Sequence, residues 1–130
     1  MKRFLLPFIA SNLILVGPLL ATTSFTTPYY SQDEYQNAHV MFNKILTDLD
    51  RAQSNDHPKI IGDGARFDIA RTEIGKLENQ WDQACFDSGE FDHTYSALNM
   101  VLADNRLTGH DRDVLSADES RLIDFRNEYY

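Results

Sequence analysis

Histidine and carboxylate side chains are the residues of this chain that could bind a metal ion. Transition metals are usually held by histidine or cysteine ligands spaced by a helical turn or a tight turn. Four histidines occur, at positions 39, 57, 93 and 110, and no two lie within one helical turn of each other. The sequence therefore predicts no metal site. His93 follows Glu90 and Asp92, and His110 precedes two aspartates, so weak metal binding stays as an alternative.

Acidic loops between helices raise the question of calcium. A helix–loop–helix calcium site needs oxygen ligands at loop positions one, three and five, glycine at six and glutamate at twelve. A loop counted from Asp104 places Gly109 correctly, but Arg106 falls at position three and Leu115 at position twelve. A loop counted from Asp87 fails as well. No regular calcium loop is predicted.

Sequence motifs of enzymes are missing. The chain has no glycine-rich phosphate loop, no HExxH zinc pair and no G-x-S-x-G nucleophile turn. A run of carboxylates could supply an acid/base pair, namely Glu73, Glu78, Asp82 and Asp87. Because Arg71 and Lys76 are interleaved with it, we interpret the run as a solvated, ion-paired helix face. We predict no catalytic residue, no cofactor and no enzymatic activity.

Tyrosines gather near both ends of the chain, where no core obviously needs them. Tyrosine is enriched in recognition surfaces because its ring buries area while its hydroxyl keeps a polar partner. The candidate interaction surface therefore consists of Tyr29, Tyr30, Tyr35, Tyr129 and Tyr130. Packing of these rings against frayed helix ends is the other interpretation, and the sequence favours it over an interaction surface.

Cys85 is the only cysteine, so a disulfide within the chain is excluded. It follows Trp81 by four residues on an apolar stripe, which predicts a small buried side chain. A disulfide between two chains, giving a homodimer through Cys85, is the less favoured alternative.

The first residues have the layout of a secretory signal peptide. Lys2 and Arg3 precede an apolar run over 4–21, and Thr22 begins a stretch of small residues of the kind that a signal peptidase accepts. An uncleaved anchor helix is the alternative, since the run approaches the length needed to span a bilayer. The sequence predicts a signal peptide over 1–21 and a periplasmic or secreted protein.

The chain is strongly acidic, with 12 basic and 20 acidic side chains and a net charge of −8. Cleavage after residue 21 would remove only Lys2 and Arg3 from this count, leaving about −10. Such a surface repels phosphate backbones and anionic headgroups, so we expect neither a nucleic-acid partner nor a membrane partner after cleavage.

Four segments carry the three- and four-residue apolar spacing of amphipathic helices. The first, 31–54, begins at a capping box, Ser31-Gln32-Asp33-Glu34. The next two are 64–85, in which a glycine at position 75 suggests a close helix crossing, and 90–103. The last stripe is interrupted by Asp118 within a second capping box, which predicts a short turn at 110–115 and a main helix at 117–127.

Short connections between helices favour antiparallel neighbours. The prediction is an all-α, up-and-down antiparallel four-helix bundle over 31–127, preceded by an exposed segment at 22–30. The large core side chains expected to close it are Phe42, Phe67, Trp81, Phe91, Leu98, Leu122 and Phe125.

A recurring set of short stretches resembles a pattern in small exported proteins of soil bacteria that have no assigned function. The stretches lie within 64–127 and include 66–71, Trp81-Asp82, 104–107, 112–116 and 124–126. The resemblance implies an exported helical domain and no catalytic or binding residue. A weaker likeness, through 107–111, is to periplasmic stress proteins of the LTxxQ type, although Asp111 replaces the glutamine and the pattern occurs once.

These observations favour a non-enzymatic interaction or structural domain of the cell envelope with an unknown protein partner. A periplasmic, chaperone-like stress protein is the first alternative, and it would need an exposed apolar groove. A weak metal-binding protein using His93 or His110 is the second.

Overall fold

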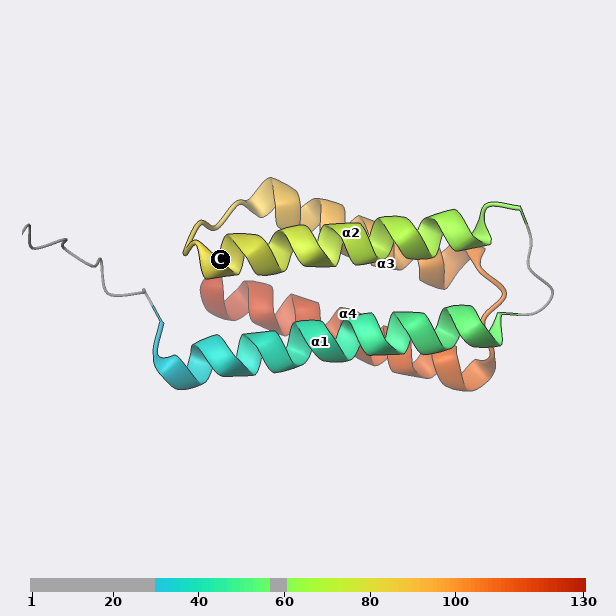
Figure 1. Cartoon of the computed structure of the whole chain (residues 1–130), viewed down its shortest axis with the longest axis horizontal. Coiled ribbons are helices and arrows are strands. Elements are labelled where there is room, and N and C mark those ends of the chain that lie inside the picture. Colours follow the sequence, from blue (N-terminus) through green and yellow to red (C-terminus); the bar gives the residue numbers. More distant parts are fainter. Residues whose placement is uncertain (1–29, 57–60) are drawn as a thin grey trace, which may run out of the picture.

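The computed structural model describes residues 30–56 and 61–130, and four α-helices make up nearly all of them (Figure 1). Each helix contacts two others: α1 and α3 both pack against α2 and α4. The predicted all-α fold with four packed helices is confirmed. The helix bounds are α1 Gln32–Asn55, α2 Asp63–Asp82, α3 Ser88–Asp104 and α4 Gly109–Tyr129.

Successive helices run in opposite directions along the long axis of the molecule (Figure 1). The predicted signal peptide, residues 1–21, lies outside the described residues, as does most of the segment 22–30. None of the four helices combines the length and the apolar character needed to cross a bilayer.

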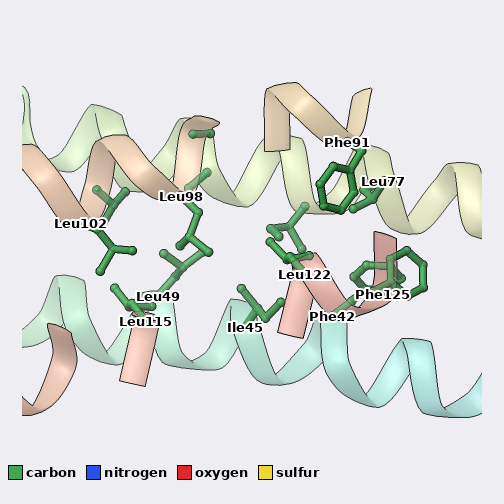
Figure 2. Close-up of a cluster of buried hydrophobic side chains, with 14 of the residues drawn as sticks. Phe42, Ile45, Leu49, Leu77, Phe91, Leu98, Leu102, Leu115, Leu122 and Phe125 are labelled. Carbon is green, nitrogen blue, oxygen red and sulfur yellow. The ribbon is translucent and has the colours of Figure 1, made fainter. Parts of the chain in front are cut away.

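The interior is built from the apolar stripes of all four helices. Figure 2 shows Phe42, Ile45 and Leu49 of α1 facing side chains of the other helices. Every large core residue expected from the sequence is buried, at 5% exposure or less. Burying a side chain of this size contributes about 1.5–3 kcal/mol, so the packing of the stripes is what holds the helices together.

Side-chain caps fix where three of the helices begin. The capping box at α1 is present: Glu34 donates its backbone N–H to Ser31 Oγ at 3.2 Å, and Ser31 N donates to the Glu34 carboxylate at 2.5 Å. Asp87 caps α3 through Gly89 N at 2.8 Å. Thr108 caps α4 through the backbone N–H of Asp111 at 3.1 Å. Each such cap contributes about 1 kcal/mol.

The prediction that Cys85 is buried is wrong. Helix α2 ends at Asp82, three residues before the expected end, and Ala84 has a positive φ of 49° that turns the chain away. Cys85 therefore lies in the loop between α2 and α3 and is exposed.

The predicted division of the last segment is also wrong, because α4 is continuous from Gly109 to Tyr129. Asp118, which interrupts the apolar stripe, points inward and is fully buried at 0% exposure. It accepts a hydrogen bond from Arg121 on its own helix and faces Asp48 of α1, itself 4% exposed. A pair of buried carboxyl groups thus occupies a place that the periodicity assigned to a helix break.

Two glycines, one just before α2 and one inside it, should respond oppositely to replacement by alanine. Gly62 has φ of +98°, the left-handed region, whereas Gly75 is helical and no atom lies within 4 Å of the position that its Cβ would take. The close helix crossing suggested at Gly75 is therefore absent. We expect Gly62→Ala to destabilise the protein by about 1 kcal/mol and Gly75→Ala to stabilise it by about 0.5–1 kcal/mol. Urea unfolding of both variants checks this, and a destabilised Gly75→Ala would contradict the open space around that glycine.

Candidate functional site

Four of the five tyrosines of the candidate surface come together at one end of the bundle, around Trp81. Tyr30 stacks on Trp81 with ring centroids 3.9 Å apart, and Tyr129 meets the indole edge to face with ring centroids 4.8 Å apart. Tyr35 stacks on Tyr30 at 5.9 Å. We call this group the aromatic cluster; it comprises Tyr30, Tyr35, Trp81, Phe86, Phe91, Phe125, Tyr129 and Tyr130.

The tyrosines differ in how much of their surface is open to a partner. Tyr30, assigned by the sequence to an exposed segment, is only 6% exposed, so that assignment is wrong for this residue. Its hydroxyl donates to the main-chain oxygen of Trp81, which ties the chain before α1 to the end of α2. Tyr130 is 40% exposed and Tyr129 is partly buried. Tyr29 lies outside the described residues.

The phenol groups of the aromatic cluster stay neutral at physiological pH. Burial, followed by the charge of Glu128, raises the pKa of Tyr129 to about 12. Burial, followed by the charge of Asp87, raises the pKa of Tyr130 to about 12. Neutral phenols offer a hydrogen-bond donor beside an apolar ring, the combination found where proteins recognise one another.

A histidine bridge lies beside these rings. His39 Nδ1 is 2.7 Å from Glu78 Oε1, and His39 Nε2 is 2.8 Å from Asp82 Oδ1. Tyr35 donates its hydroxyl to the same Asp82 oxygen at 2.8 Å. The imidazole of α1 thus lies between two carboxylates of α2. His39 is therefore a partly buried histidine that is hydrogen-bonded through both ring nitrogens.

A groove of about 270 Å³ opens between α1 and α4 next to Tyr129. Its apolar lining consists of Ala38, Met41, Phe125 and Tyr129. Its polar lining consists of Glu34, Asn37, Arg121, Asp124 and Glu128. The groove thus has an apolar floor and a rim on which three carboxylates outnumber one guanidinium.

The carboxylates that the sequence analysis considered for acid/base chemistry do not form one site. Glu78 and Asp82 bond His39, so two of the four carboxylates considered for acid/base chemistry form the histidine bridge. Glu73 is brought instead to Glu90 and His93 on α3, a grouping that sequence reasoning missed. Its only signal in the sequence is the three-residue spacing of the α3 pair, which places both on one helix face.

The groove was also missed, because its two walls are at least 80 positions apart in the chain. Comparison with known proteins gives no help in assigning it: no protein-family model, no curated protein and no solved structure matches this chain. The candidate functional site is therefore defined by geometry alone, as the groove together with the exposed edge of the aromatic cluster.

Proposed function

We propose that this protein is a non-enzymatic binding domain of the cell envelope that holds a basic, amphipathic segment of a partner protein in the groove between α1 and α4. The observation that carries the proposal is the apolar floor of the groove under an acidic rim. The export signal read from the sequence supplies the location in the periplasm or outside the cell.

The groove is small and open rather than enclosed, and this shape favours side chains of a partner over a small-molecule ligand. Sites for small molecules and cofactors usually enclose about 300–1,000 Å³ and bury most of their ligand. The groove between α1 and α4 measures about 270 Å³, which suits one or two apolar side chains from a helix or strand of another protein. Helix-in-groove recognition uses such anchors, presented at helical spacing.

The charges on the rim favour a basic partner. Glu34, Asp124 and Glu128 lie on the rim with Arg121, in a chain whose net charge is −8. Lysine or arginine flanking an apolar anchor would meet these carboxylates, and the overall negative field would speed its approach. The groove also offers little to acidic segments, which gives it selectivity.

Binding of matched peptides tests the proposal. The probes are two fluorescein-labelled helical peptides with leucine at three- and four-residue spacing, one with lysine and one with glutamate at the polar positions. We expect saturable 1:1 binding of the lysine peptide and none of the glutamate peptide by fluorescence anisotropy. Asp124→Lys combined with Glu128→Lys should weaken binding of the lysine peptide about tenfold or more, or about 1.4 kcal/mol.

The control makes the same change in net charge at the opposite end of the bundle, at the end of α3 and the start of α4. Asp104→Lys combined with Asp113→Lys alters two exposed aspartates away from the groove, so affinity should fall by less than threefold. Equal losses in the two double variants would mean non-specific attraction and would overturn the groove as the binding site. Binding of both peptides, with suppression of client aggregation, would support the chaperone-like alternative instead.

A further inference from the structure

Three potential metal ligands converge where α2 packs against α3, away from the groove. Glu73 of α2 and Glu90 and His93 of α3 each offer one ligand atom, and these atoms all lie within 4.8 Å of one another. Glu90 and His93 share a face of α3 because they are three residues apart. The hydroxyl of Thr94, a fully buried residue, donates to the main-chain oxygen of Glu73 at 3.1 Å and holds the two helices in register here.

The two carboxyl groups are an unfavourable pair unless something positive lies between them. Burial and the neighbouring Glu73 raise the pKa of Glu90. Lys76, which donates to Glu73 at 2.8 Å, lowers the pKa of Glu73. Two buried oxygens, Glu73 Oε2 and Glu90 Oε1, meet no hydrogen-bond donor among the described residues. A bound cation would supply positive charge to these two oxygens.

We propose that Glu73, Glu90 and His93 form a binding site for a divalent transition-metal ion such as Zn²⁺. The imidazole nitrogen distinguishes the site from calcium and magnesium sites, which use oxygen ligands alone. Three protein ligands leave a fourth position for water, the arrangement of open zinc sites.

Small side-chain movements are enough to close the site around an ion. Zinc bonds of about 2.0–2.1 Å place tetrahedral ligand atoms about 3.3 Å apart. The ligand atoms, which lie within 4.8 Å of one another, therefore need to approach by at most about 1.5 Å. His93 is exposed and gives the ion access from solvent. The Lys76 side chain is 52% exposed, so its ammonium group can release Glu73 and remain in water.

Isothermal titration calorimetry of the full chain with ZnCl₂, in a buffer that does not bind zinc, tests the site. We expect one zinc per chain, and at least tenfold weaker binding in both His93→Ala and Glu73→Gln. Because the His93 side chain is exposed, its removal should leave the helical circular dichroism unchanged, so this variant carries the test even if Glu73→Gln folds poorly. Titration with Co²⁺ should give the visible absorption of a tetrahedral ion in the wild type and not in His93→Ala.

His110→Ala is the matched control. His110 also has an acidic neighbour, but the Asp111 carboxylate is buried and already accepts hydrogen bonds from Thr108 at 2.6 Å and Asn55 at 3.2 Å. Zinc affinity should therefore be unchanged in this variant. Undiminished zinc binding in His93→Ala, or an equal loss in His110→Ala, would overturn the site. The Asp124→Lys/Glu128→Lys variant should bind zinc normally, so failure of the groove and failure of the metal site can be told apart.

Discussion

At neutral pH we expect Asp118→Asn to be more stable than the wild type by up to about 3 kcal/mol, and to lack a fall in stability that the wild type shows between about pH 4 and pH 6. Burial, followed by the charge of Asp48, raises the pKa of Asp118 from 3.8 to about 6. Lys44 on α1 and Arg121 on α4 also face the pair and offset part of this effect.

The direction of this pH dependence follows from which state of the protein keeps the proton on Asp118. Between pH 3.8 and about 6 the folded protein keeps a proton on Asp118 that the unfolded chain has lost. The contribution of Asp118 to stability is therefore complete below the unfolded value and disappears as the pH rises through the folded value. Asparagine keeps the shape, keeps an oxygen for Arg121 and supplies an N–H toward Asp48, so it replaces the proton permanently.

Urea unfolding at pH 4.5 and pH 7 measures this effect. Asp113→Asn, an exposed change on the same helix, is the control and should follow the wild type at both values. The same loss of stability with rising pH in Asp118→Asn as in the wild type would show that the buried carboxyl pair does not titrate as described.

Removing the indole of Trp81 should cost about 3–5 kcal/mol, a large part of the total stability of a small domain. Trp81 is 1% exposed, and its ring meets Tyr30, Phe125 and Tyr129 at centroid distances of 3.9, 5.1 and 4.8 Å. Trp81→Ala would leave a cavity into which none of these rings can move without losing its other contacts.

The measurement is urea unfolding together with the near-ultraviolet circular dichroism of the aromatic rings. Ile69→Ala, on the same helix and 45% exposed, serves as the control and should change stability by less than about 0.5 kcal/mol. A loss below about 1 kcal/mol in Trp81→Ala would mean that the aromatic cluster is loosely packed.

The four helices could be predicted because their stripes and caps are local signals. Phe67, Ile74, Leu77 and Trp81 recur at helical spacing, and all are buried. Ser31 begins α1 through side-chain bonds to residues three positions away. Such patterns depend only on neighbours in the chain, so the sequence is enough to place them.

The features that the sequence did not predict depend on partners that are distant in the chain. The sequence pattern predicts a helix break at Asp118, because its partner Asp48 is 70 positions away in the chain. Tyr30 is buried only because Trp81 lies under it. The periodicity places Cys85 on the apolar stripe because neither glycine nor proline marks the early end of α2. That end is set instead by the positive φ of Ala84.

Both candidate sites are also formed by residues that are distant in the chain. The groove needs α1 and α4 side by side, and the metal ligands need α2 against α3. Histidine spacing along the chain excluded a metal site made by one segment, but it could not exclude one shared by two helices. A single carboxylate from a neighbouring helix is enough to complete a ligand set, and its position is decided by packing.

The Phe86 ring contacts the rings of Tyr30 and Tyr130, with centroid distances of 6.4 and 5.3 Å. The first and last parts of the described bundle therefore both contact this one side chain. A mechanical load applied through these two ends would separate the ring contacts one after another. It would not have to slide α1 past α4 along their full length. The bundle should yield to pulling at low force even though its interior is well packed.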